Sequence, residues 1–170
     1  MLHGALDAAL ADGLSQLTFG RLAKRLEVSD RVVVYYFPSK GELVGAVLRH
    51  LGTELQTRLA DVVTTPQADY LAVAKLAWPV LACPEVDPLF GLLLEANGLA
   101  AAGVEPYATM VKSLVTEWVE WLASFISGTG EYRRTEAETA LALIDGLLLM
   151  RQLAGPRAAN RAAIRLGIRG

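Results

Sequence analysis

Side chains that can bind anions or stack on flat rings are concentrated in one short stretch of the chain, residues 17–40. The stretch holds five Lys or Arg residues against two Asp or Glu residues, and it includes the adjacent pair Tyr35 and Tyr36. A guanidinium such as that of Arg31 can donate two hydrogen bonds to the edge of a guanine, and an ammonium such as that of Lys40 can bind phosphate. These residue types at this density are typical of contact with a nucleic acid.

Two short helices and a tight turn would have to position these side chains. Thr18 can cap the first helix, because a threonine hydroxyl accepts a hydrogen bond from a free amide of the first turn. Ser29 can cap the second helix, which we expect to end near Tyr36. Ser39 precedes a glutamate by three residues, which is the spacing of a capping box, and it would start a long helix that reaches about residue 63. The pattern predicts a helix-turn-helix.

In a helix-turn-helix the second helix lies in the major groove of DNA and reads base edges from its N-terminal end. Here Arg31 would meet a guanine, Val32 a thymine methyl group, and Tyr35 a base or a sugar. Thr18 and Lys40 suit phosphate. The candidates for DNA contact are Thr18, Ser29, Asp30, Arg31, Val32, Tyr35, Tyr36 and Lys40. The alternative is a plain helical hairpin with a solvated basic face.

The same stretch resembles the N-terminal domain of the TetR family of one-component transcriptional regulators. The matching residues are Thr18, Leu22, Ala23, Val28, Ser29, Phe37, Lys40 and Leu43. The resemblance covers about the first 50 residues, and the remainder matches only in the number and order of its helices. It implies that Tyr36 and Lys40 hold phosphate. It also implies that Arg31, Val32 and Tyr35 face bases, and that the body forms a dimer and binds a small molecule.

Three features depart from the family's pattern. Glu27 stands in the turn where the family usually has glycine, and a side chain there strains a positive-φ backbone slightly. Val34 stands where the family usually has an aromatic residue, so Tyr35 is the candidate to replace that backbone contact. Many members carry a basic arm before the first helix, whereas no Lys or Arg precedes Arg21 here. Either that arm is absent or the chain begins late.

The composition favours a folded protein of the cytoplasm. The chain has 170 residues, of which 53% are apolar and 20% are charged, and this argues against disorder. The net charge of −2 argues against a protein that coats nucleic acid along its whole surface. We expect no signal peptide, because the N-terminus has no basic flank, and no membrane span, because no apolar run is long enough.

Residues for catalysis or metal binding are sparse. Cys83 is the only cysteine, which excludes an internal disulfide and a Cys-rich zinc site. His3 and His50 lie far from it in sequence, and no metal-ligand spacing, phosphate loop or nucleophile elbow occurs. A carboxylate pair such as Glu117 and Glu120 is more simply a solvated helix face. We therefore expect no enzymatic activity, no metal and no cofactor.

Apolar residues recur at helical spacing nearly throughout, which predicts an all-α protein of about nine helices. Prolines after Thr65, Asp87 and Glu105 mark three helix starts. The expected helices of the body lie at about 66–82, 87–101, 105–127, 134–154 and 156–166. Pro79 should kink the first of them. We expect a helix-turn-helix domain at 1–49 and a helical ligand-binding and dimerisation domain at 50–170.

Aromatic and sulfur-containing side chains gather in the middle third of the chain. For any one of them core packing is favoured, and the alternative is a ligand chamber with mainly apolar walls between facing helices. Glu95 interrupts an apolar run and would receive a cation or a hydroxyl if it faced inward, although an outward position is favoured. The candidate pocket residues are Trp78, Phe90, Glu95, Met110, Leu114, Trp118 and Trp121.

The last two expected helices have the pattern of half of a four-helix bundle, which a second copy of the chain would complete. The candidate dimer contacts are Leu141, Ile144, Leu148, Arg151, Ala159, Ala163 and Leu166. Beside them Arg157, Arg161 and Arg165 stand one helical turn apart, and like charges at that spacing repel by roughly 0.2–0.5 kcal/mol per pair. Either solvation or an acidic side chain such as Glu136, of the same chain or of the partner, would offset this repulsion.

The favoured function is that of a DNA-binding regulator, a repressor that leaves a palindromic operator when a small, largely apolar ligand spreads its two reading helices. The alternative is a DNA-binding dimer that acts constitutively or through a protein partner, with no small-molecule effector. An internal cavity in the body favours the first of these, and a tightly filled body favours the second.

Overall fold

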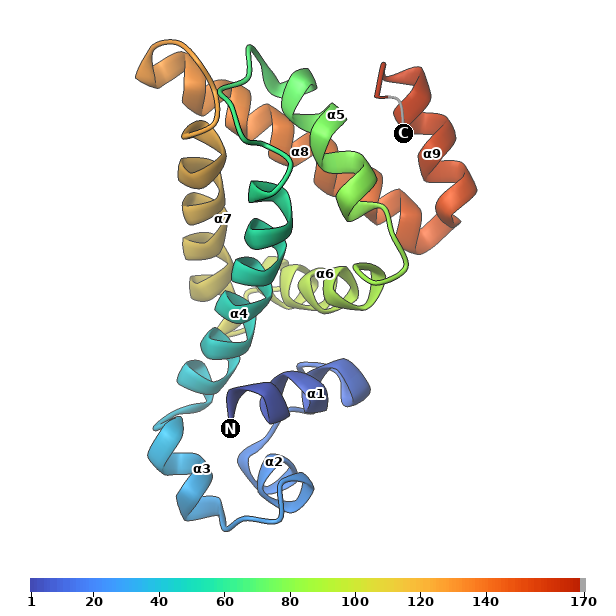
Figure 1. Ribbon diagram of the computed structural model, residues 1–170. Coiled ribbons are helices and arrows are strands. Elements are labelled where there is room, and N and C mark those ends of the chain that lie inside the picture. The colour runs from blue at the N-terminus through green and yellow to red at the C-terminus, as the bar shows by residue number, and fades with distance from the viewer. Residues whose placement is uncertain (169–170) are drawn as a thin grey trace. The chain divides into compact units, whose positions relative to one another are not determined.

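The computed structural model describes residues 1–168, and the regular elements of this part of the chain are nine α-helices (Figure 1). In chain order they are α1 (Leu2–Asp12), α2 (Phe19–Arg25), α3 (Asp30–Tyr36), α4 (Lys40–Ala60), α5 (Tyr70–Leu81), α6 (Asp87–Ala101), α7 (Tyr107–Ala123), α8 (Gly130–Ala154) and α9 (Pro156–Arg165). The prediction of an all-α fold with an N-terminal helix-turn-helix is confirmed. Over residues 1–168, no helix has both the length and the apolar character needed to cross a membrane.

Local capping signals set the helix starts of the N-terminal region. The Thr18 hydroxyl accepts a hydrogen bond from the Arg21 amide at 3.3 Å, and α2 begins at the next residue. The Ser39 hydroxyl accepts from the Glu42 amide at 3.1 Å at the start of α4. Ser29 occupies the N-cap position of α3 as predicted, but its side chain makes no capping hydrogen bond.

Two helices of the body begin elsewhere than expected. The start of α5 lies after Asp69, whose carboxylate accepts from the Ala72 amide at 2.8 Å, and not at Pro66. The preceding segment is extended because Gln67 exchanges backbone hydrogen bonds with Phe125 and Ser127. Helix α8 begins earlier than expected, because Thr129 caps it through the Tyr132 amide at 3.3 Å.

The described residues form two compact units, each with its own buried side chains. The first unit comprises Met1–Thr53 and Pro88–Ser113, and the second comprises Glu54–Asp87 and Leu114–Gly170. Buried side chains of the first unit include Leu14, Leu22, Val33, Leu43 and Leu48. A core cluster of the second unit consists of Val73, Val119, Leu122, Ile126, Ala137 and Ala140. These units follow a different division from the predicted domains 1–49 and 50–170, which stay a prediction.

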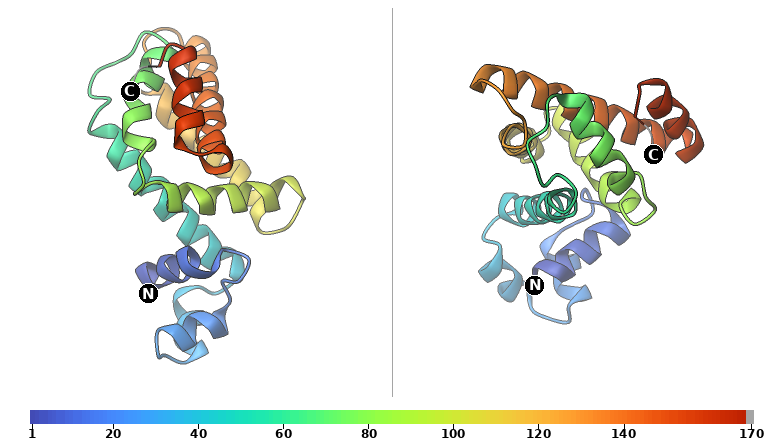
Figure 2. Two further views of the ribbon diagram at one scale, coloured as in Figure 1. Left: turned by 90° about the vertical axis from the view of Figure 1, so that its right-hand side faces the viewer. Right: turned by 45° about the horizontal axis from the view of Figure 1, so that its top comes forward.

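Within the second unit, α8 packs against both α5 and α9 (Figure 2). Gly155 separates α8 from α9 and has a φ of 85°, a left-handed conformation that is inexpensive only for glycine. The chain reverses there, and α9 runs back along α8. The inward face of α9 carries Ala159 and Ala163, whose small side chains allow this close approach.

Candidate nucleic-acid interface

Helix α3 is held by one face and exposed on the others. Val33 and Phe37 are buried, and α3 packs against α2. The side chains of Tyr35 and Tyr36 are 82% and 57% exposed. All eight residues predicted to contact DNA lie on the exposed surface of the first unit. The N-terminal end and the outer face of α3 are therefore exposed to solvent within the first unit.

The basic side chains of this region differ in whether they are already engaged. Arg25 forms an ion pair with Asp12 at 3.5 Å, and Arg21 donates a hydrogen bond to Gln16. Arg31 and Lys40, by contrast, form no ion pair with any residue between 1 and 168. Their charges are therefore free to neutralise phosphate or to bind a base edge.

The two tyrosines of α3 are arranged edge to face, with ring centroids 5.4 Å apart and an interplanar angle of 89°. This contact orients Tyr35 while leaving most of its ring in solvent. An exposed ring of fixed orientation can stack on a base or a sugar at low cost in conformational entropy. The geometry is compatible with the predicted role of Tyr35.

The turn between α2 and α3 contains backbone strain. Glu27 has a φ of 54°, and within residues 1–168 it is the single non-glycine residue with a positive φ. The following amide, that of Val28, donates to the Ala23 carbonyl at 3.0 Å and closes the turn. The expectation that a glycine-favouring conformation is occupied here by a glutamate is confirmed.

Comparison with known proteins agrees with this geometry. Residues 1–47 match the family model of bacterial regulatory proteins of the tetR family. The N-terminal region of this chain is therefore similar to that family, as its sequence predicted. No curated protein matches it.

Solved structures similar to this chain share its fold along nearly the whole length. A transcriptional regulator from Rhodococcus sp. Rha1 has 24% identity and a TM-score of 0.73, with 98% of this chain and 91% of that chain covered. A protein assigned to the TetR family from Rhodococcus sp. has 17% identity and a TM-score of 0.77, with coverage of 98% and 95%. A protein of Saccharomonospora viridis, solved in complex with choline, has 20% identity and a TM-score of 0.68, with coverage of 98% and 90%.

The predicted pocket residues are divided between the two units. Phe90, Glu95 and Met110 belong to the first unit, and the members of the second unit are Trp78, Leu114, Trp118 and Trp121. Trp118 contacts Trp121 edge to face, with centroids 5.4 Å apart, and both pack against the core cluster of the second unit. The pocket itself stays a prediction. An open groove of about 330 Å³, lined by none of these residues, lies where α7 ends and α8 begins.

Glu95 has partners that its sequence neighbourhood did not indicate. Its two carboxylate oxygens accept hydrogen bonds from the backbone amides of Leu14 and Ser15, both at 2.8 Å. Burial raises the pKa of the Glu95 carboxyl, but the bonds from Ser15 and Leu14 lower it by more, so the pKa is below its usual value. The hydroxyl of Tyr107 donates to the Leu14 carbonyl at 3.0 Å, and burial, together with the Glu95 charge, raises the pKa of Tyr107.

Most residues predicted to form the dimer contact are buried within their own subunit. Ile144, Leu148, Arg151, Ala159 and Ala163 face the interior of the second unit, and Leu141 is partly buried. Of the predicted set only Leu166 is exposed. The large apolar side chains that α8 and α9 expose are instead Leu149, Met150, Leu153 and Ile164. The predicted dimer contacts on α8 therefore face α5 and α9. A different face of α8, which carries Leu149 and Leu153, is exposed.

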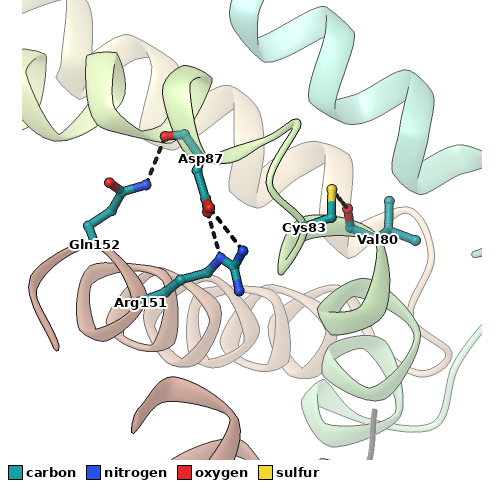
Figure 3. Close-up of polar contacts among 5 residues, drawn as sticks. All are labelled: Val80, Cys83, Asp87, Arg151 and Gln152. Atoms are coloured by element: carbon teal, nitrogen blue, oxygen red, sulfur yellow. Dashed lines mark hydrogen bonds and ion pairs between the residues drawn. The ribbon is translucent and has the colours of Figure 1, made fainter. Parts of the chain in front are cut away.

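Arg151 is engaged inside the second unit (Figure 3). Its guanidinium donates two hydrogen bonds to the Asp87 carboxylate, from Nε to Oδ1 at 2.5 Å and from Nη2 to Oδ2 at 2.9 Å. The side chain of Gln152 donates to the Asp87 carbonyl at 2.8 Å. Hydrogen bonding to Asp87 raises the pKa of Arg151. These contacts hold the first residue of α6 against the C-terminal part of α8.

Proposed function

We propose that this TetR-family regulator binds a palindromic DNA operator as a homodimer, and that a small, largely apolar ligand in its C-terminal domain releases it. DNA contact is assigned to Thr18, Ser29, Asp30, Arg31, Val32, Tyr35, Tyr36 and Lys40 of the N-terminal domain. The single observation that carries the proposal is the outer face of α3, where Arg31 has no ionic partner among residues 1–168 and Tyr35 stands in solvent.

A second copy of the chain is the occupant we propose for the open face of α8. Ala142, Gly146, Leu149 and Leu153 are all exposed, and their spacing of four, three and four residues places them on one side of the helix. Small residues at Ala142 and Gly146 would allow two helices to approach closely, and Leu149 and Leu153 would supply apolar contact. A two-fold dimer is also what a palindromic operator requires, because its two half-sites lie about 34–36 Å apart.

A small-molecule effector is supported by the chemistry of the body. The second unit contains three neighbouring aromatic rings, Trp118, Trp121 and Phe125, with the last two centroids 4.8 Å apart. Clustered aromatic rings can bind apolar or cationic groups. The Saccharomonospora viridis protein was solved with choline, and we carry over to this chain only the expectation of a small organic ligand. Release requires the ligand to prefer the state with spread reading helices.

One observation favours the alternative of a regulator without a small-molecule effector. Glu95 was the one charged group predicted to contact a ligand, and its carboxylate is occupied by the amides of Leu14 and Ser15. A constitutive or partner-controlled regulator would keep those hydrogen bonds permanently.

The test begins with selection of duplexes from a random 20-base-pair pool by the unaltered protein, followed by affinity measurement on the selected sequence. A palindromic sequence bound by two copies supports the proposal, and failure to enrich any sequence contradicts it. Fluorescence anisotropy of the selected duplex is then followed across a library of small apolar and quaternary-ammonium compounds. Release by one chemical class supports the repressor model, and retention of DNA throughout supports the alternative.

A further inference from the structure

The connection between α1 and α2 is held by side chains that come from α6 and α7. The Leu14 amide donates to Oε2 of Glu95 and the Ser15 amide donates to Oε1, each at 2.8 Å. The Leu14 carbonyl accepts from the Tyr107 hydroxyl at 3.0 Å. Both backbone polar groups of Leu14 are therefore bonded to side chains distant in sequence, all within the first unit. We call Gly13, Leu14, Ser15, Glu95 and Tyr107 the Leu14 clamp.

Gly13 is required by the same arrangement. Its φ is 86°, which favours glycine, and a Cβ built on it would stand 3.0 Å from Oε2 of Glu95. A side chain at this position would press on the carboxylate as well as strain the backbone. The end of α1 is thus shaped to admit the carboxylate.

The clamp lies immediately before the part of the protein that meets DNA. The Leu14 carbonyl also accepts from the Leu17 amide at 3.2 Å, and Thr18 then caps α2. The clamped connection is therefore joined through Leu17 to the Thr18 cap and the first amides of α2. A hydrogen bond weakens strongly when a 2.8 Å separation passes about 3.5 Å. A displacement of α6 by less than about 1 Å from Leu14 would therefore loosen both bonds.

We propose that Glu95 and Tyr107 are positioning residues for DNA binding, through which α6 and α7 determine the placement of α2. The inference rests on the proposed DNA-binding function and goes beyond it, since neither residue touches DNA. A movement of α6 displaces the Glu95 carboxylate, and with it the connection at Leu14 and Ser15 that precedes α2 and the reading helix α3. Loss of the clamp weakens DNA binding even when the protein remains folded.

A matched pair of tyrosine variants tests the proposal. Tyr107→Phe removes the buried bond to the Leu14 carbonyl, and Tyr132→Phe removes an exposed bond of similar length, 3.1 Å, to the Ala68 carbonyl in the second unit. Both variants are compared on the selected duplex at a temperature where circular dichroism shows full helicity. We expect Tyr107→Phe to lose affinity by roughly three- to tenfold, the effect of one neutral hydrogen bond, and Tyr132→Phe to stay within about twofold. Equal affinities for the two variants overturn the proposal.

Glu95→Gln gives a second test with a readout independent of DNA. The amide keeps the shape of the side chain but presents an N–H group to one of the two backbone donors, so one bond of the clamp is lost. We expect hydrogen exchange at Leu14 and Ser15 to accelerate by roughly tenfold, with exchange in α8 unchanged and DNA affinity reduced in parallel. Glu120→Gln, at an exposed position of α7, is the control.

The outcomes separate the two proposals. If the unaltered protein binds a selected duplex and the Tyr107 and Glu95 variants bind it equally well, the positioning role is wrong and the proposed function stands. The positioning role is also wrong if Glu95→Gln accelerates hydrogen exchange at Leu14 but leaves the affinity for DNA unchanged. If the unaltered protein binds no duplex, the proposed function fails, and the positioning role fails with it.

Discussion

Arg151 and Asp87 form a two-point ion pair whose partners differ in burial (Figure 3). The Arg151 side chain is 5% exposed, whereas that of Asp87 is 33% exposed. A buried charge that loses its partner costs more free energy than a charge that water can reach. The two halves of this pair therefore have unequal importance for stability.

Substitution of either partner should show that inequality. Asp87→Asn should lower the free energy of unfolding by about 3 kcal/mol, because it leaves the buried guanidinium without a counter-charge. Arg151→Met should cost only about 1 kcal/mol, because methionine fills similar space and water solvates Asp87. Urea denaturation measures both. Arg134→Met, which breaks an exposed pair with Glu138, is the control and should cost under about 1 kcal/mol. Equal losses for Asp87→Asn and Arg151→Met would contradict the assignment.

Arg31 and Lys40 should affect DNA binding in different ways. Arg31→Ala should cost roughly 1–3 kcal/mol on the selected duplex and relax the base preference at one position, because a guanidinium reads guanine. Lys40→Ala should weaken binding to all sequences alike and reduce the slope of affinity against salt concentration by about one, because it removes a phosphate contact. Affinity measured on selected and scrambled duplexes at several salt concentrations separates the two. A uniform loss in both variants would show that Arg31 does not read a base.

Leu153 should be central to self-association. Its side chain is 77% exposed on the open face of α8. Leu153→Asp should weaken the dimer by roughly a hundredfold or more, because two buried leucines are lost and two charges are brought together. Sedimentation equilibrium measures the change. Val104→Asp, at an exposed apolar position of the first unit, should leave the association unchanged. A monomeric unaltered protein, or an unaffected Leu153→Asp dimer, would falsify this face as the contact.

Relief of strain at Glu27 should stabilise the protein. Glu27→Gly should raise the free energy of unfolding by about 0.5–1 kcal/mol, because the left-handed conformation costs an L-residue more than it costs glycine. Glu27→Ala keeps the strained backbone and removes only the carboxylate, so it should change stability little. Urea denaturation of the pair separates backbone strain from charge. Equal effects of the two variants would mean that the φ of 54° is not a source of strain.

Asp145 should make the stability of the protein fall as pH rises through the mildly acidic range. Burial raises the pKa of this carboxyl from 3.8 to about 6. Since the folded pKa lies above the unfolded one, the contribution of Asp145 is fully present below about pH 4 and is lost as pH rises through 6. Asp145→Asn should remove this dependence and add roughly 2–3 kcal/mol at pH 7 relative to the unaltered protein. Urea denaturation between pH 4 and 8 measures it, with the exposed Asp61→Asn as control. If Asp145→Asn and the unaltered protein show the same dependence of unfolding free energy on pH, the Asp145 carboxyl is solvated in the folded protein.

The capping predictions at Thr18 and Ser39 agreed with the structure, whereas the start of α5 and the partners of Glu95 depended on residues distant in sequence. Thr18 and Ser39 cap helices where their spacing indicated, because a capping bond joins residues three apart. The start of α5 was misplaced at Pro66, because the backbone of Gln67 pairs with residues near 126. Glu95 is bonded to residues 80 and 81 positions away, which no local pattern indicates.

The sequence by itself determined the helical class, the caps at Thr18 and Ser39, and the face of α3 that carries Arg31 and Tyr35, because hydrophobic period and capping chemistry act within a few residues. It also placed a glutamate in a turn that favours glycine. Only the tertiary structure decided which of two apolar stripes of α8 is core. The stripe through Ile144 and Leu148 packs inside the subunit, and the stripe through Leu149 and Leu153 remains open. Both stripes have helical period, and packing against α5 and α9 chooses between them.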